Sequence, residues 1–475
     1  MAKGSGESDR ARNYHRPVLR GQLFLAAAAP ALSVLVAGCG SSSHVSAKPD
    51  AAPAMRARIM RVSVLDGDTN RIVPGARVTV DSRAARSDRR GLAIVRRVGR
   101  HIRSITVSAP GYTPRALPTP SAGRLVVRIY RPLTQWTMYG VTPERTQAQT
   151  AIHLRPPFHV VWSRNLHALL EFPAVVADGI AYVWNGSGFL FAISMQDGSL
   201  LWRFAAGARQ QDSSPAVVGD LLVAHSKGGR VLVFNRFTGH LLWQRWVGAA
   251  IESSPLVIDG IDYFGDWGGT VYALDLRTRR FRWTFHGGCK ITASAAIAGG
   301  TVYLGDYCGR LLALSATRGT LRFAASAGSP VYGSSAIAYG RVYTPSRDSG
   351  ALVAFTRSGD RLWSVSTGAY VYSAPAVWGG RVYFGSYNGL LYCVSATSGS
   401  VLWRAWVGGR ISGSPTVVDG IVYAGSFADR IVGVDARTGR AVFRFPHGYY
   451  VAVAGNGGRL LLHSWSGLWA IEPRR

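Results

Sequence analysis

The chain has 475 residues, enough for two or three domains, and its 47% apolar residues and 56 glycines favour many short strands joined by tight turns. The formal net charge is +29, and because only four lysines occur, nearly all of the excess is arginine. Either the arginine codons of a GC-rich genome explain this excess, or it draws the protein to an anionic surface such as lipid headgroups or an acidic envelope polymer. We do not expect a nucleic acid partner, because the N-terminal sequence predicts export from the cytoplasm.

The N-terminal segment predicts a lipoprotein signal. Four arginines precede an apolar run from Leu23 to Val36, which is too short and alanine-rich for a comfortable membrane span. The run ends in Val36-Ala37-Gly38-Cys39, which resembles a bacterial lipobox. This resemblance implies cleavage before Cys39 and a diacylglyceryl group on its sulfur, so residues 1–38 are expected to be the signal peptide and 39–54 a polar tether. The alternative is an ordinary secretory signal with a chance cysteine.

Residues 55–131 form a basic module with strand periodicity. Apolar and polar residues alternate in five segments separated by Asp, Gly and Pro turns: Arg61–Leu65, Ala76–Val80, Leu92–Val95, Ser104–Ser108 and Arg124–Tyr130. The motifs Val64-Leu65-Asp66, Ile72–Ala76 and Val107–Tyr112 resemble the carboxypeptidase regulatory-like (transthyretin-like) β-sandwich, which implies a non-catalytic accessory domain. The module holds 17 arginines against four aspartates and no glutamate. We therefore expect it to contact anionic lipid or wall polymer.

Residues 132–157 are a lead-in, and 158–475 are a repeat domain. Each repeat has four short apolar runs separated by glycine turns, and aromatic residues mark a period of 40 or 41 residues: Trp162, Trp202, Trp243, Trp283, Phe323, Trp363, Trp403 and Phe443. A four-strand unit at this period is typical of a β-propeller blade. Eight first-strand motifs occur, and Phe158–Trp162 is predicted to supply the outer strand that the last repeat lacks. The expected fold is all-β, an eight-bladed propeller behind a small sandwich, with seven blades as the alternative.

The lead-in segments Trp136–Gly140 and Pro143–Thr146 resemble those of quinoprotein-like propellers. The repeats carry the tryptophan-docking pattern of that family, for example at Ala273, Asp275, Thr278 and Trp283. The resemblance implies that each indole fills the gap between neighbouring blades, where a small residue leaves room for it. We therefore predict that this aromatic series is core, together with a second series: Tyr263, Tyr303, Tyr343, Tyr383 and Tyr423. Cys393 replaces the small residue and is expected to be a buried thiol.

One face of the propeller is predicted to bind a partner. If strands run from the centre outward, the loops that enter each blade and the turns after its second strand share a face. Five of those turns carry an aromatic residue: Trp267, Tyr307, Tyr387, Phe427 and Trp465. The entering loops add Tyr332, Tyr370, Tyr372, Tyr449 and Tyr450, with Arg209 and Arg410. Exposed rings with arginines suit protein binding or sugar stacking. The alternative is that each ring only caps its neighbouring blade.

Residues suited to chemistry are few. Cys289 lies in an entering loop and Cys308 in the next turn of the same blade, so we expect a disulfide between them in an exported protein. A quinone-dependent dehydrogenase would need adjacent cysteines beneath its cofactor, and none occur. His286 and His447 stand alone without metal-ligand spacing. The acidic residues of the expected face are interpreted as solvated turn residues: Asp212, Glu252, Asp266, Asp306, Asp348 and Asp429. No catalytic, cofactor or metal site is predicted.

The predicted function is that of a non-catalytic, membrane-anchored, extracytoplasmic binding protein. The repeats resemble the BamB-type propeller lipoproteins, and this resemblance implies a monomer with a protein partner in envelope protein assembly. The basic module is a departure from that family. Two alternatives stay open: a relative of the PQQ-dependent dehydrogenases with an altered site, and a binder of cell-wall polysaccharide.

Overall fold

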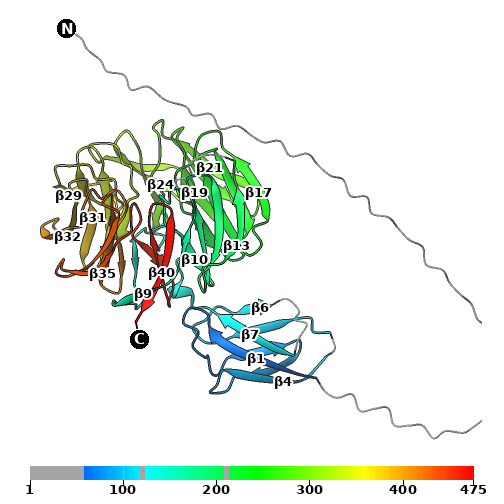
Figure 1. Ribbon diagram of the computed structural model, residues 1–475. Coiled ribbons are helices and arrows are strands. Elements are labelled where there is room, and N and C mark those ends of the chain that lie inside the picture. The colour runs from blue at the N-terminus through cyan, green and yellow to red at the C-terminus, as the bar shows by residue number, and fades with distance from the viewer. Residues whose placement is uncertain (1–57, 100, 118–122, 208–212, 475) are drawn as a thin grey trace, which may run out of the picture. The chain divides into compact units, whose positions relative to one another are not determined.

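A computed structural model describes residues 58–99, 101–117, 123–207 and 213–474, and Ala57–Arg475 forms one compact unit (Figure 1). The predicted signal peptide, the tether and Cys39 lie outside the described residues, as do Arg209 and Asp212, so lipidation stays a prediction. Within the described residues, no helix has the length and hydropathy that crossing a membrane requires.

The basic module folds as two sheets around a shared core. One sheet has the order β4-β1-β7 and the other β3-β2-β5-β6. The strands are β1 Arg58–Asp66, β2 Arg77–Val80, β3 Arg83–Arg86, β4 Leu92–Val98, β5 Ile105–Ser108, β6 Arg115–Leu117 and β7 Arg124–Ile129. Every second residue of β1 is buried, so Met60, Val62 and Val64 face the core while Arg61 faces solvent. The strands β3 and β6 were not predicted, because these short edge strands lack apolar alternation.

Eight further sheets follow the module, one for each repeat counted in the sequence. We number them as blades, with the innermost strand first. Blades one to four are β10 Val175–Ala177, β11 Ile180–Trp184, β12 Phe189–Ser194 and β13 Leu200–Ala205; β14 Ala216–Val218, β15 Leu221–Ser226, β16 Arg230–Asn235 and β17 Leu241–Trp246; β18 Leu256–Ile258, β19 Ile261–Gly265, β20 Thr270–Asp275 and β21 Arg280–His286; β22 Ala296–Ala298, β23 Thr301–Gly305, β24 Arg310–Ser315 and β25 Leu321–Ser326.

Blades five to seven are β26 Ala336–Ala338, β27 Arg341–Ser346, β28 Ala351–Thr356 and β29 Arg361–Ser366; β30 Ala376–Trp378, β31 Arg381–Gly385, β32 Leu390–Ser395 and β33 Val401–Trp406; β34 Thr416–Val418, β35 Ile421–Ser426, β36 Arg430–Asp435 and β37 Ala441–Phe445. Blade eight is β38 Val453–Gly455, β39 Leu460–His463, β40 Gly467–Pro473 and β9 Phe158–Asn165. The sheets follow one another around the propeller from green to red in Figure 1.

The first and last parts of the propeller meet in blade eight. The strand β9 pairs antiparallel with β40 along its whole length, from Gly467 opposite Asn165 to Pro473 opposite Phe158. One hydrophobic cluster joins residues of blades one, seven and eight, including Val183, Ile431 and Leu461. The predicted completion of the last blade by residues 158–162 is therefore present: β9 pairs with the edge of β40 and is the outer strand of blade eight.

Residues of the two aromatic series join several blades to the blades that follow them. The Nε1 of Trp283 and the hydroxyl of Tyr263 both donate to the carbonyl of Ala316 in the following blade, at 2.8 and 3.3 Å. The same geometry recurs at the carbonyls of Arg236 and Ala436. The tyrosine series is buried, as predicted. The series from Trp162 to Phe443 was also predicted to be core, but only Trp162 and Trp283 are buried and the other six are partly buried. The reason is that these residues lie on the outer strands, which border solvent.

The lead-in, residues 132–157, lies against the innermost strands of the blades. The sequence predicted no structural role for it. It contains the 3-10 helix η1 Pro132–Thr134 and the strand β8 Ala148–Gln149, which pairs in parallel with β34. Backbone carbonyls of the lead-in accept from the inner strands of six blades, in the pairs Trp136–Val176, Thr137–Val217, Pro143–Ile297, Glu144–Ile337, Thr146–Val377 and Gln147–Val417. The buried side chain of Arg145 also donates to the carbonyls of Pro255 (3.0 Å), just before the inner strand of blade three, and of Ala295 (2.7 Å), just before that of blade four. The lead-in therefore supplies partners for backbone groups that would otherwise be unpaired at the centre of the propeller.

Candidate partner-binding face

Backbone hydrogen bonds place the entering loops and the second turns side by side. In four blades the amide of the turn aromatic donates to the carbonyl of the residue 17 positions earlier, in the pairs Trp267–Ala250, Tyr307–Lys290, Tyr387–Tyr370 and Phe427–Arg410, at 2.9–3.0 Å. The carboxylates of Asp266 and Asp306 fold back to accept the amides four residues later. The predicted shared face is therefore present, and one repeated backbone motif builds it.

Eight rings on this face contact one another in an unbroken series, which we call the aromatic band: Tyr332, Tyr370, Tyr372, Tyr387, Phe427, Tyr449, Tyr450 and Trp465. Ring centroids lie 4.8 Å apart for Tyr372 and Tyr387, and 4.6 Å apart for Phe427 and Tyr449. The band runs from the entering loop of blade five to blade eight. Aromatic pairs at these distances stabilise one another, which partly supports the alternative that the rings cap neighbouring blades.

Two of the eight rings of the aromatic band are nevertheless exposed to solvent, and the other six are partly buried. Tyr370 is 48% exposed and Trp465 50%, and Arg410 beside the band is also exposed. Outside the band, Trp267 is 40% exposed, while Tyr307 is partly buried. Single exposed rings are common on folded proteins, but a contiguous series of rings with accessible members is typical of interaction surfaces.

A charged cluster continues the face beyond the aromatic band. Glu252 is buried and accepts from the indole of Trp267 (3.0 Å) and the hydroxyl of Tyr332 (2.8 Å). The ammonium of Lys290 lies 3.6 Å from the Trp267 ring centroid and 4.7 Å from that of Tyr307. Burial lowers the pKa of Lys290, and the charge of Glu252 opposes this shift. Cation–π contacts and the carboxylate therefore hold these rings in place.

The entering loops also surround a central cavity of about 60 Å³. Glu171, Glu252, Tyr332, Tyr372 and Tyr450 line its wall. Burial raises the pKa of Glu171 to about 7, the charge of Glu252 adds to this shift, and Lys227 opposes it. A cavity of this size holds a few water molecules, whereas sites for cofactors and drug-sized ligands are typically about 300–1,000 Å³.

The structure overturns part of the interpretation of the acidic residues. Glu252, Asp266 and Asp306 are buried and hydrogen-bonded rather than solvated, because each satisfies donors of its own turn or of a neighbouring loop. Asp348 and Asp429 are exposed, as predicted. Composition alone cannot show which carboxylates turn inward.

The disulfide between Cys289 and Cys308 is present, with a Cα–Cα distance of 5.9 Å. It joins the entering loop of blade four to its turn and lies next in sequence to the Lys290–Tyr307 pair, so it fixes that end of the face. Cys393 is a buried free thiol, as predicted, and burial raises its pKa to about 11.

The residues present do not fit a quinone cofactor. The central cavity is several times smaller than such a site, and the lead-in lies along the inner strands. Within the described residues, no group of three or more His, Cys, Asp and Glu side chains could hold a metal ion. The buried pair of His225 Nε2 and Asp262 Oδ2, 2.9 Å apart, was missed in the sequence. Both side chains are fully buried, so the pair ties blades two and three together and meets no substrate.

Comparison with known proteins agrees with the fold. A family model described as outer membrane protein assembly factor BamB matches residues 159–284, 267–373 and 348–461, well over half of the chain. The chain is similar to the solved structure of a quinohemoprotein alcohol dehydrogenase from Comamonas testosteroni, with 14% identity and a TM-score of 0.63 over 72% of this chain and 81% of that one. It is also similar to BamB from Moraxella catarrhalis, with 16% identity and a TM-score of 0.57 over 67% and 98% of the two chains. The computationally designed Ika8 protein shows 16% identity and a TM-score of 0.57 over 66% and 98%. At these identities the similarity establishes the propeller fold. No curated protein matches in sequence.

Proposed function

Since this chain belongs to the family whose model is described as outer membrane protein assembly factor BamB, we propose that it is a non-catalytic scaffold of the cell envelope whose aromatic band captures a protein partner. The protein acts outside the cytoplasm, held to a membrane through an acylated Cys39. In this proposal the signal peptide is residues 1–38 and the tether is residues 39–54. The accessory sandwich is residues 55–131, and the propeller that binds the partner is residues 158–475.

The observation that carries this proposal is the unbroken aromatic band. It combines the exposed rings of Tyr370 and Trp465 and six partly buried rings with neighbouring cations, including Arg410 and Lys290. Protein interfaces are enriched in tyrosine, tryptophan and arginine, since rigid amphipathic side chains bury a large area at little entropic cost. The contacts among the rings hold the band in place before binding, which reduces the ordering cost of association.

Site-specific photocrosslinking in intact cells tests the proposal. A benzophenone amino acid replaces Tyr370 or Trp465, and the matched control carries it at Trp406, which is 62% exposed but lies on the outer strand of blade six. We expect adducts with one envelope protein from the two face positions and none from the control. Equal adducts from all three positions, or none from the face, would contradict the proposal.

A double substitution separates binding from capping. Tyr370→Ala with Trp465→Ala, which truncates the two most exposed rings of the aromatic band, is expected to weaken partner capture while the unfolding midpoint stays close to that of the unchanged protein. A loss of stability that matches the loss of capture would show that the rings serve packing instead. Capture of purified wall glycan, rather than protein, would favour the polysaccharide-binding alternative.

A further inference from the structure

The outward side of the β4-β1-β7 sheet combines arginines with aliphatic residues. We call it the basic sheet face, and its residues are Ile59, Arg61, Ile94, Arg96, Arg124 and Val126. The strand register places Arg61 between Ile94 on β4 and Arg124 on β7, and Ile59 opposite Arg96. The aliphatic members are unusually accessible for strand residues: Ile59 is 36% exposed, Ile94 39% and Val126 53%. The face therefore alternates positive charge and apolar area.

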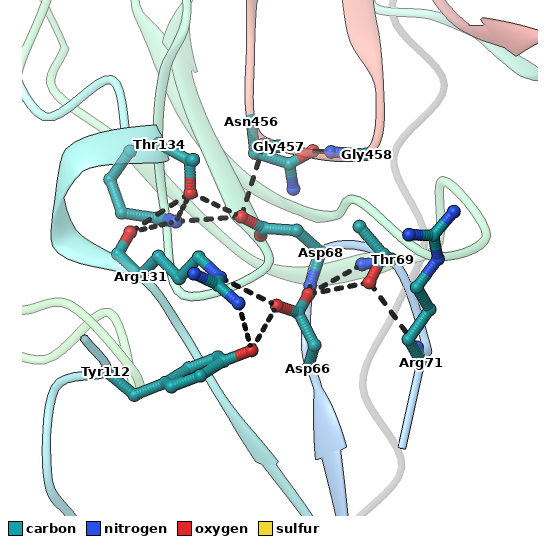
Figure 2. A network of polar contacts seen from close by, with 11 residues as sticks. Asp66, Asp68, Thr69, Arg71, Tyr112, Arg131, Thr134, Asn456, Gly457 and Gly458 are labelled. Atoms are coloured by element: carbon teal, nitrogen blue, oxygen red, sulfur yellow. Dashed lines mark hydrogen bonds and ion pairs between the residues drawn. The ribbon is translucent and has the colours of Figure 1, made fainter. Parts of the chain in front are cut away.

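The carboxylates of the module do not neutralise this face. Figure 2 shows that Asp66 accepts from Tyr112 and from its own turn, while Asp68 accepts from Thr134 and the amide of Gly457. The two other acids of the module accept backbone amides of turns as well.

Within the described residues, no carboxylate forms an ion pair with Arg61, Arg96 or Arg124. Like charges directly opposite each other on a sheet, as in the Arg61–Arg124 pair, destabilise it. The face therefore carries positive charge that only an external anion can balance.

The aliphatic residues decide between two kinds of anionic partner. A soluble polyanion needs only positive charge, and exposed isoleucine and valine add nothing to its recognition. A bilayer surface offers anionic headgroups to the arginines and the edge of the hydrocarbon region to the aliphatic side chains. We propose that the basic sheet face docks on an anionic lipid bilayer, with Arg61, Arg96 and Arg124 on headgroups and Ile94 and Val126 inserted between them.

Vesicle co-sedimentation tests this proposal on the full chain with Cys39→Ala, which lacks the acyl anchor. The vesicles are phosphatidylcholine with or without about one third phosphatidylglycerol, and we expect binding to the anionic vesicles that weakens as salt rises. A basic residue near such a surface contributes about fivefold in affinity. The triple variant Arg61→Gln, Arg96→Gln and Arg124→Gln should therefore bind about a hundredfold more weakly.

A matched control removes the same charge elsewhere. Arg77→Gln, Arg83→Gln and Arg103→Gln take three exposed arginines from the other sheet of the module and its adjoining loop, and should leave binding within a fewfold. Equal losses in both triple variants would overturn the proposal, because net charge alone would explain the binding. Absence of binding to anionic vesicles would overturn it as well.

A second pair of substitutions separates lipid from polymer. Ile94→Ser with Val126→Ser keeps every charge and should weaken vesicle binding severalfold while leaving binding of a soluble polyanion such as polyphosphate unchanged. Unaltered vesicle binding by this variant would contradict insertion and identify an anionic polymer as the partner. All side chains substituted within the basic module are exposed, and an unchanged unfolding midpoint verifies the fold of each variant.

Discussion

Replacement of Arg145 by methionine should weaken the propeller at its centre. The guanidinium is fully buried and donates to the carbonyls of Tyr139, Pro255 and Ala295. Arg145→Met keeps the length of the side chain but leaves three buried carbonyls without these donors. A hydrogen bond to a charged group contributes about 1.5–3 kcal/mol, so the three bonds together contribute roughly 4–9 kcal/mol.

Burial of the charge offsets part of this contribution. No carboxylate pairs with Arg145 among the described residues, and burial lowers the pKa of the guanidinium from 12.5 to about 10. This shift corresponds to a cost of about 3 kcal/mol, which the methionine variant avoids. The expected net loss in unfolding free energy is therefore about 3 kcal/mol, within the range seen when a buried polar network is broken.

Urea unfolding followed by tryptophan fluorescence measures the effect. The control is Arg357→Met, which removes an exposed arginine with a single bond to the carbonyl of Ala298 and should cost less than about 0.5 kcal/mol. An Arg145→Met variant as stable as this control would refute the view that the lead-in holds the inner strands through Arg145.

Three further predictions concern the face and the blades. Burial and the charge of Glu252 raise the pKa of Glu171 from 4.5 to about 7, so between these pH values the folded protein keeps a proton that the unfolded chain releases. The free energy of unfolding should therefore fall by at most about 3 kcal/mol as the pH rises from 4.5 to 7. Glu171→Gln should remove this part of the pH dependence in unfolding curves. Gly319→Ala places a Cβ 2.5 Å from Trp283 Cδ2 at φ +69° and should lower the unfolding midpoint more than Gly300→Ala, at φ +70° with nothing within 4 Å; equal effects would argue against indole docking. Alkylation in denaturant without reductant should label Cys393 alone once Cys39 is acylated or replaced, and three labels would contradict the disulfide.

Much of the fold follows from local pattern. The 40-residue spacing of indoles such as Trp283 and Trp403 repeats one short unit, and each unit buries its apolar runs against identical neighbours. The aromatic band was predictable for the same reason, because a fixed place in the repeat becomes a fixed place on one face. The disulfide was predictable as well, because the repeat places Cys289 and Cys308 on the same face of one blade.

Features that depend on long-range geometry were not predictable. Arg145 bonds to residues more than 100 positions away, and nothing in its neighbourhood distinguishes it from the many surface arginines. Glu252 and Asp306 resemble ordinary turn acids in sequence, yet Glu252 lies beneath Trp267 and Tyr332. The edge strands β3 and β6 show no apolar alternation in sequence, because each pairs with one neighbouring strand and contributes little to the core.

The pairing of β9 with β40 also sets the order in which the protein can mature. A chain that emerges from its N-terminal side releases Phe158–Asn165 about 300 residues before Gly467–Pro473, its one strand partner among the described residues. Until that late segment arrives, the early one remains an open edge able to pair with a wrong sequence. A chaperone that shields newly exported strands should therefore matter more to this protein than to one whose sheets are completed as they emerge.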